Sequence, residues 1–395
     1  MKRVALRRLF DVINGGTPTS EPENWDGDVP WATPVDLGRV NGGRLGETLR
    51  TLTKEGLKTG SSLVPAGSLV VSTRAPIGYV AETTTAMAFN QGCRGLSPRA
   101  ELDVRYFRYQ LSASTEQLQA LGQGSTFAEL STDSLRSFLL AAPSAHSQRA
   151  IADYLDSETT RMDKLVALRR RGQETLSELR RSVLDDAFGS DETEVWRLKH
   201  LLAQPPCYGV LVPRFSDDGV PFVRVGDIEG IAMGVAPALA IEPSLSEEYG
   251  RTKLHAGDVV LSVVGSVDKV AVVPPAIVGA NVARAVCRLV PQRGVPSELL
   301  ALWLQSSAYL SQAAAATGAD SAQPTLGMGD LANFVVQFPR SDIAREFHKR
   351  LERRLKHIAE LDATASRHVD LLQERRQALI TAAVTGQLEI PGVAA

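Results

Sequence analysis

The chain has 395 residues, of which 44% are hydrophobic and 22% are charged, and its formal net charge at pH 7 is −2. Hydrophobic cores rarely grow beyond about 250 to 300 residues, so this length predicts several domains, and the near-neutral charge excludes a strongly basic nucleic-acid binder while leaving local phosphate contacts open. No apolar run reaches the roughly 18 residues that cross a membrane, and no signal peptide precedes Leu6, so we expect a cytoplasmic protein without membrane contact.

The first predicted domain covers residues 1–145 and combines a small sheet with helix. Prolines and glycines divide it into short extended segments and tight loops, at residues 15–18, 26–34, 65–67 and 74–78. An apolar strand is expected at residues 68–72. A helix is expected from Asp103 to about Ala120, with aromatic residues crowded on one side.

A long helix is predicted next, over residues 146–190. Pro143 is a helix breaker before it, and Ser144 and Ser147 are possible N-caps. At 1.5 Å per residue, about 40 residues would extend roughly 60 Å. A heptad pattern of apolar residues on a charged helix predicts a seam that is buried against a second helix. The apolar residues of this seam are Ile151, Leu155, Met162, Leu165, Leu176 and Leu179.

The second half of the chain repeats the first in outline. Residues 191–340 are predicted to form a second domain, in which residues 220–228 correspond to residues 29–37 and Asn281 corresponds to Asn90. A helix near residues 299–309 corresponds to the one near Tyr106. The chain is therefore interpreted as a tandem duplication.

The last segment, residues 341–395, repeats the long helix in the same heptad phase. Its seam residues are Phe347, Leu351, Ile358, Leu361, Leu372 and Leu379. We predict an α+β fold in which two globular domains are separated by two long helices, paired as an antiparallel coiled-coil spacer.

Catalytic signatures are absent from the sequence. It contains neither a GxxxxGK[ST] phosphate loop nor a nucleophile elbow, and Gln204–Pro206 resembles the Asp/Asn-Pro-Pro-aromatic methyltransferase signature only superficially. Cys93, Cys207 and Cys287 lack CxxC spacing, and no histidine pair has ligand spacing, so no metal site is predicted. These observations favour a protein without a catalytic centre.

The motifs, taken together and in order, resemble the specificity subunits of Type I restriction-modification systems over nearly the whole chain. The first domain carries Gly-Gly-Thr-Pro, Asp-Val-Pro-Trp, Ser-Thr-Arg-Ala-Pro-Ile-Gly, Asn-Gln-Gly and Gly-Ser-Thr-Phe, at residues 15–18, 28–31, 72–78, 90–92 and 124–127. Further matching segments lie at residues 148–155, 221–228, 257–262, 375–380 and 384–386. The second domain departs from the family pattern because it lacks a Gly-Gly-Thr-Pro start.

The resemblance implies a division of labour. Each globular domain would be a target-recognition domain that reads one half of a bipartite, asymmetric site in double-stranded DNA. The helices would hold the two domains apart and dock two modification (methyltransferase) subunits, and restriction subunits would complete a phage-defence complex. S-adenosylmethionine, ATP and Mg²⁺ would be bound by those partners, with no cofactor in this chain.

Candidate DNA contacts come from residues near the predicted turns. Arg74 and Arg224 are expected either to contact phosphate or to pair internally with Asp36 or Asp227. Arginine suits guanine, and asparagine or glutamine suits adenine. The other candidate DNA-binding residues are Gln91, Arg94, Arg214, Asn281 and Arg284.

Two other functions remain open at this stage. A coiled-coil scaffold with two protein-binding heads would show no salt-dependent binding to DNA. A self-sufficient methyltransferase or nuclease would need a cofactor pocket of its own, and binding of S-adenosylmethionine to the isolated chain would favour it.

Overall fold

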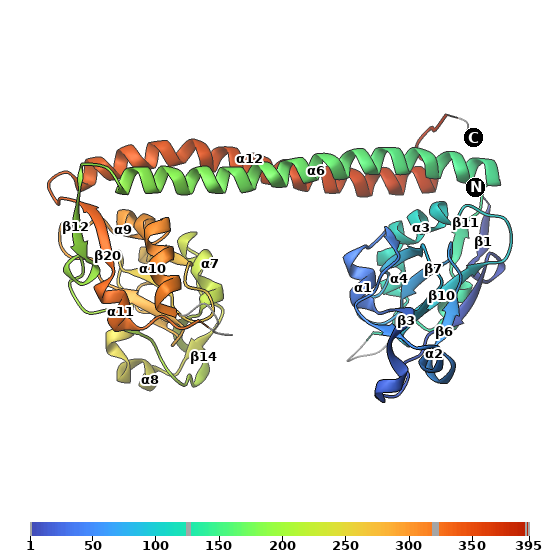
Figure 1. The fold of residues 1–395 in the computed structure, drawn as a ribbon, viewed down its shortest axis with the longest axis horizontal. Helices are drawn as coiled ribbons and strands as arrows, with labels where there is room; N and C mark the ends of the chain where they lie inside the picture. The colour runs from blue at the N-terminus through green and yellow to red at the C-terminus, as the bar shows by residue number, and fades with distance from the viewer. Residues whose placement is uncertain (1, 124–127, 318–323, 392, 394–395) are drawn as a thin grey trace. The chain divides into compact units, whose positions relative to one another are not determined.

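The computed structural model describes residues 2–123, 128–317, 324–391 and 393. The chain forms two compact units, the first made of residues 1–169 and 367–395 and the second of residues 170–366. Each unit contains a globular head and one end of each of two long helices, α6 (Ala145–Phe188) and α12 (Ala344–Thr385) (Figure 1). The predicted mixed α+β fold with two heads and two long helices is confirmed.

The first head, described at residues 2–123 and 128–141, is built on three small sheets. A five-stranded sheet has the order β2-β10-β7-β8-β4, a four-stranded sheet has the order β5-β3-β9-β6, and β1 pairs with β11. The strands are β1 Arg3–Ala5, β2 Phe10–Asn14, β3 Trp25–Ala32, β4 Arg44–Leu45, β5 Thr51–Leu52, β6 Ser62–Val64, β7 Leu69–Ser72, β8 Val80–Thr83, β9 Met87–Phe89, β10 Cys93–Pro98 and β11 Leu139–Ala141. The helices are α1 Pro34–Arg39, α2 Lys54–Gly60, α3 Val104–Ala113, α4 Thr115–Ala120 and α5 Thr132–Ser137.

The second head, residues 193–339, has the same plan. Its sheets have the orders β13-β19-β16-β17, β15-β14-β18 and β12-β20. The strands are β12 Thr193–Arg197, β13 Cys207–Tyr208, β14 Phe215–Val223, β15 Ala240–Ile241, β16 Val259–Ser262, β17 Val270–Val272, β18 Asn281–Val282, β19 Val286–Leu289 and β20 Val335–Pro339. The helices are α7 Ile228–Ala232, α8 Pro243–Glu248, α9 Ser297–Trp303, α10 Ser307–Thr317 and α11 Met328–Asn333.

Strand register supports the correspondence of residues 220–228 with residues 29–37. Trp31 in β3 pairs in parallel with β9, and Phe222 in β14 pairs in parallel with β18. Both aromatic side chains are buried, as expected of core residues. The strands end in the same way, because Asp36 accepts a hydrogen bond from the backbone N–H of Thr33 and Asp227 accepts one from that of Arg224. Thr33 and Asp36 form a reciprocal capping box that starts α1.

The correspondence of Asn281 with Asn90 is wrong. In the parallel pairs, Trp31 lies opposite Ala88 whereas Phe222 lies opposite Asn281, so Asn281 takes the place of Ala88. Ala283 takes the place of Asn90, since each donates a backbone hydrogen bond to the last residue of the preceding parallel strand. The second head has two more residues before this strand than the first head has before β9. The comparison of the two halves of the sequence did not locate this insertion.

The helix predicted over residues 103–120 is two helices, α3 and α4, which meet at Ser114. The corresponding segment of the second head is divided in the same way, into α9 and α10. Asp103 caps α3 by accepting a hydrogen bond from the backbone N–H of Arg105 at 3.0 Å.

Within each unit the ends of the long helices pair in opposite directions. In the first unit, the start of α6 and the end of α12 share a core that includes Ile151, Leu155, Ile380 and Val384. In the second unit, the end of α6 and the start of α12 share a core with Val183, Leu184, Phe347, Leu351, Leu355 and Ile358. Each core also contains residues of the head in its unit, which explains why the compact units cut across the domains expected at 1–145, 146–190, 191–340 and 341–395.

The buried helix face differs in part from the predicted seam. Ile151, Leu155, Met162, Phe347, Leu351 and Ile358 are buried, and Leu176, Leu372 and Leu379 are half-buried. Leu165, Leu179 and Leu361 are exposed, whereas Leu355, Val369 and Ile380 are buried outside the predicted phase. A helix of 3.6 residues per turn drifts relative to a strict heptad, and each helix end also packs against a head, which widens the buried face.

Candidate nucleic-acid interface

The Gly-Gly-Thr-Pro motif of the first head packs directly on the Asn-Gln-Gly loop. A Cβ atom on Gly15 would lie 2.0 Å from the carbonyl oxygen of Asn90, so only glycine fits there. The N–H of Gly16 donates to the carbonyl oxygen of Phe89 at 3.0 Å, and Gly16 accepts a hydrogen bond from the indole N–H of Trp31 at 3.0 Å. The hydroxyl of Thr17 donates to the side-chain oxygen of Gln91.

The loop at residues 72–79 lies against the same Asn-Gln-Gly turn. The backbone N–H groups of Thr73 and Arg74 donate to the carbonyl oxygen of Gly92, at 2.8 Å and 3.3 Å. The loop is closed on itself by Ser72, whose hydroxyl donates to the carbonyl oxygen of Pro76 at 2.7 Å and accepts from the N–H of Tyr79 at 2.9 Å. Three motifs that are distant in the sequence therefore form one surface of the first head. The Gly-Ser-Thr-Phe motif at residues 124–127 lies outside the described residues.

Two arginines of this surface converge on Glu129. Arg74 lies 3.2 Å and Arg94 lies 3.8 Å from its carboxylate. Arg94 is buried and donates to the carbonyl oxygens of Gln91 and Cys93 and to the hydroxyl of Thr132, at 2.8 to 2.9 Å. Arg94 thus positions the turn that carries Gln91, while the side chains of Gln91 and Arg74 keep exposed polar atoms.

Of the two internal ion pairs expected, the one between Arg224 and Asp227 is present, whereas Arg74 has a different partner. Arg224 forms an ion pair with Asp227 at 3.4 Å. Arg74 pairs with Glu129 rather than with Asp36, because the carboxylate of Asp36 is occupied by the N-cap of α1 and by the N–H of Leu49 at 2.8 Å.

The candidate residues of the second head lie in different environments. Asn281 is fully buried, and it bonds to Ser246, to Thr252 and to the carbonyl oxygen of Tyr249. Arg214 is half-exposed and pairs with Glu242 at 2.8 Å. Arg284 is exposed between β18 and β19, and within the described ranges its guanidinium has no ion pair. Because Asn281 is buried, it is suited to positioning the segments to which it bonds. In this head, the prediction of a DNA contact therefore applies to the exposed side chains of Arg214 and Arg284.

Comparisons with known proteins show what this chain is similar to. Residues 1–167 match the Type I restriction modification DNA specificity domain. The specificity subunit of the MjaIX Type I restriction enzyme from Methanocaldococcus jannaschii is 31% identical over 178 residues, which are 44% of this chain and 40% of that protein. The specificity subunit of the EcoBI Type I enzyme from Escherichia coli is 24% identical over 312 residues, which are 72% of this chain and 65% of that protein. The first part of the chain therefore carries a Type I restriction modification DNA specificity domain, and the chain is similar to Type I specificity subunits.

A solved chain from work on complex assembly and conformational transition of the type I R-M system has the same fold. It superposes with a TM-score of 0.70 over 98% of both chains at 16% sequence identity, a level that shows the fold alone. The chain spans less than two thirds of the length of either specificity subunit with which its sequence was aligned.

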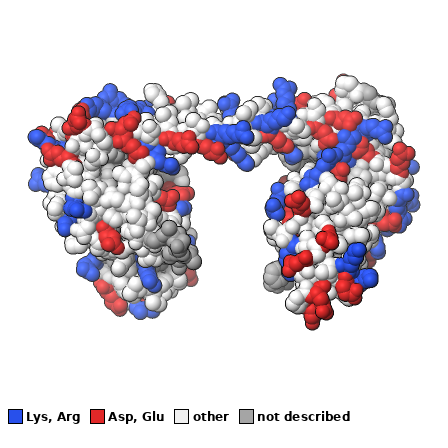
Figure 2. All heavy atoms as spheres, viewed as in Figure 1, with Lys and Arg blue, Asp and Glu red and all other residues white. Residues whose placement is uncertain are grey.

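The charge of this chain is mixed rather than basic. On the face drawn in Figure 2, lysine and arginine side chains are interspersed with aspartate and glutamate over both heads. In the part of the chain that the structure describes, no group of three or more His, Cys, Asp or Glu residues could hold a metal ion. No described helix is both long and apolar enough to span a bilayer.

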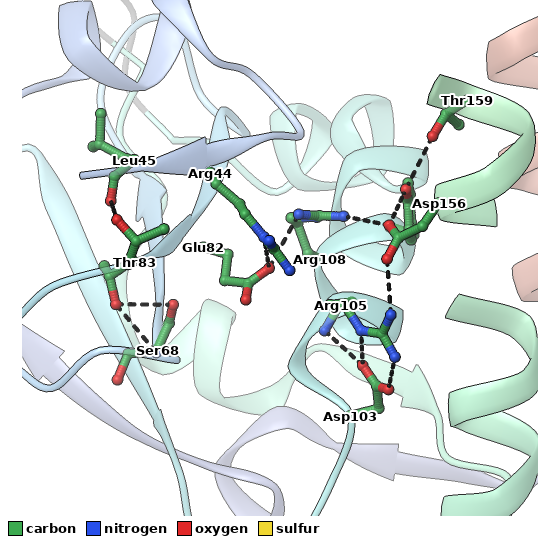
Figure 3. A network of polar contacts seen from close by, with 12 residues as sticks. Arg44, Leu45, Ser68, Glu82, Thr83, Asp103, Arg105, Arg108, Asp156 and Thr159 are labelled. Carbon is green, nitrogen blue, oxygen red and sulfur yellow. Dashed lines mark hydrogen bonds and ion pairs between the residues drawn. The ribbon is translucent and has the colours of Figure 1, made fainter. Parts of the chain in front are cut away.

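Sequence reasoning missed the polar network that joins the first head to α6 (Figure 3). Arg108, whose side chain is only 6% exposed, lies 3.1 Å from both Glu82 and Asp156. Asp156 also accepts a hydrogen bond from the hydroxyl of Tyr109 at 2.6 Å and pairs with Arg105 at 2.8 Å. Arg105 pairs in addition with Asp103 and Asp153.

A signal for this network was present in the sequence. Arg105, Arg108 and Tyr109 have i, i+3 and i+4 spacing, so they share one face of α3, and Asp153 and Asp156 have i, i+3 spacing on α6. The opposite charges on two helices could have predicted that the helices pack together. Buried Arg288 of the second head, which pairs with Asp258 at 2.6 Å, had no comparable signal because its partner lies in a turn 30 residues earlier in the chain.

Proposed function

We propose that this chain is the DNA-recognition subunit of a Type I restriction-modification complex and that it has no catalytic centre of its own. The observation that carries the proposal is the surface of the first head, where the motifs at residues 15–18, 72–78 and 90–92 meet around Gln91. These segments lie within the matched specificity domain. A rigid turn that presents an exposed amide beside an arginine is suited to groove contacts with DNA.

The duplicated plan supports a bipartite target. Two heads of one fold with different surface residues would each read one half of an asymmetric site, and the paired helices would set the gap between the halves. We propose two modification subunits and restriction subunits as partners, with S-adenosylmethionine, ATP and Mg²⁺ bound by those subunits. Both aligned relatives are named specificity subunits of restriction enzymes.

The proposal is tested by co-expressing the chain with its cognate modification subunit and mapping methylated adenines across the host DNA. We expect one split motif, with two short specific halves and a fixed gap. Methylation at unsplit sites, or a stable complex without methylation, would contradict the proposal and favour a scaffold with two protein-binding heads.

A point substitution tests the proposed contacts of the second head. Arg284→Ala is expected to weaken binding to the methylated motif by about 1–3 kcal/mol and to relax one base position of a single half-site, because an exposed arginine on a loop can bond to guanine. The measurement is a binding titration against DNA with single base changes. Arg340→Ala is the matched control, since Arg340 is exposed but pairs with Asp342. Equal losses in the two variants would mean that Arg284 makes no specific contact.

A further inference from the structure

The joint between head and helix differs in the two units at corresponding positions. Three alignments fix which positions correspond. Leu69 pairs with Glu82 in the first head, as Val259 pairs with Val272 in the second. Asp103 directly precedes α3 and Pro296 directly precedes α9, and the buried starts of α6 and α12 lie 196 positions apart. Six residues of the network therefore have counterparts in the second unit. The counterparts are Val272 for Glu82, Glu298 for Arg105, Ala301 for Arg108, Leu302 for Tyr109, Glu352 for Asp156 and Leu355 for Thr159.

All six of these second-unit residues line one open groove of about 870 Å³ between the second head and the long helices. In the first unit the same place is filled by the long side chains of Arg105 and Arg108 and their carboxylate partners. Short apolar side chains replace the central ones in the second unit, so the space stays open and its floor is apolar. An accessible apolar groove of this size is typical of binding sites.

In its described part, the second unit also lacks an ion pair that the first unit has beside this place. In the first unit, Arg376 of α12 lies 3.4 Å from Asp163 of α6. The corresponding residues of the second unit are Arg180 and Ala359, and both line the groove. Arg180 donates to the side-chain oxygen of Gln305 at 2.7 Å, and among the described residues no carboxylate lies within ion-pair distance of it. Burial lowers the pKa of Arg180.

The remaining charges of the groove also favour an anionic ligand near Arg180. Arg353 and Lys356 of α12 line the groove, and their ion pairs with exposed glutamates are long, at 3.9 Å and 4.0 Å, so these pairs contribute little. Glu298 and Glu352 also line it, but both are exposed and hydrated, whereas Arg180 is half-buried. A half-buried guanidinium without a counterion is the group that gains most from a carboxylate.

We propose that this groove is a docking site for a polypeptide segment that places apolar side chains on the groove floor and a carboxylate against Arg180. On the basis of the proposed function, the partner that supplies this segment is the modification subunit. The first unit satisfies its own joint with Arg108, Asp156, Asp163 and Arg376 and has no need of such a segment. The two units would therefore hold their modification subunits by different contacts.

The test supplies the missing carboxylate from within the chain. Ala359→Asp recreates the pair that Asp163 and Arg376 form in the first unit, and Arg180→Gln removes the charge. Both variants, as full chains, are expected to bind purified modification subunit about tenfold more weakly at one of two sites, because a charge pair across the interface is lost. Arg180→Lys keeps the charge and is expected to retain most of the affinity. Titration calorimetry measures affinity and stoichiometry together.

Asp163→Ala, the reverse change at the corresponding position of the first unit, is the matched control and should leave modification-subunit binding unchanged. Unaltered binding by folded Ala359→Asp and Arg180→Gln chains would overturn the inference while the proposed function stands. A loss of DNA affinity in the chain without partner would also overturn it, because the groove would then take phosphate. If the wild-type chain neither binds the subunit nor directs split-site methylation, the proposed function itself fails.

Discussion

Asp156→Ala is expected to destabilise the joint between the first head and α6 by about 3–5 kcal/mol, because it leaves Arg108 buried without one of its two carboxylates. The substitution also removes the acceptor of the Tyr109 hydroxyl and one partner of Arg105. A two-unit chain need not unfold in one step, so hydrogen exchange of the backbone amides of α3 is the suitable measurement. We expect those amides to exchange faster by two or more orders of magnitude.

The chain contains its own controls for this measurement. Asp153→Ala removes only an exposed carboxylate that pairs with Arg105, and the expected loss is about 1 kcal/mol or less. The amides of α9 in the second head should be unaffected, since Glu352, at the position that corresponds to Asp156, has no arginine partner among the described residues. Equal effects of Asp153→Ala and Asp156→Ala would mean that the network does not hold the joint.

Local signals in the sequence were sufficient to predict the two long helices. Pro143 and Ser144 precede a helix that begins at Ala145, and the hydroxyl of Ser144 accepts a hydrogen bond from the N–H of Ser147 at 3.2 Å, whereas Ser147, the other N-cap candidate, lies inside the helix. The duplicated apolar pattern identified both long helices. Such features depend on residues a few positions apart, which is why a single sequence reveals them.

Features that depend on tertiary packing could not be predicted in the same way. Asn281 was expected near a turn, as a candidate DNA contact, but the register of β14 and β18 places it inside a strand, where it is fully buried. Arg94 sits close to an exposed turn in the sequence and is nevertheless buried under Glu129 and Thr132. A side chain's burial at a loop depends on segments that arrive from elsewhere in the chain, and no local pattern encodes them.

The duplication has kept the backbone plan and changed the chemistry at corresponding places. A backbone β-bridge joins Arg74 to Glu129 in the first head, and the corresponding β-bridge joins Val264 to Thr325 in the second. The side chains of Arg74 and Glu129 also form an ion pair, which valine and threonine cannot form. The second head has instead acquired a buried ion pair of its own, between Arg288 and Asp258. Each head is therefore stabilised independently, as expected if each carries its own specificity.

Arg288→Met is expected to destabilise the second head by about 3–5 kcal/mol, because it leaves the buried carboxylate of Asp258 without its arginine partner. Arg288 also donates to the carbonyl oxygen of Arg251 and to the ring of His255, both at 2.8 Å, so the turn at residues 251–258 loses its anchor. Faster hydrogen exchange in β16 and β19, with β7 and β10 of the first head unchanged, is the expected result. Adding Asp258→Asn should restore part of the stability, because a neutral amide oxygen can still accept from the N–H of His255. If the double variant is less stable than Arg288→Met alone, then the uncompensated charge is not the cause of the loss.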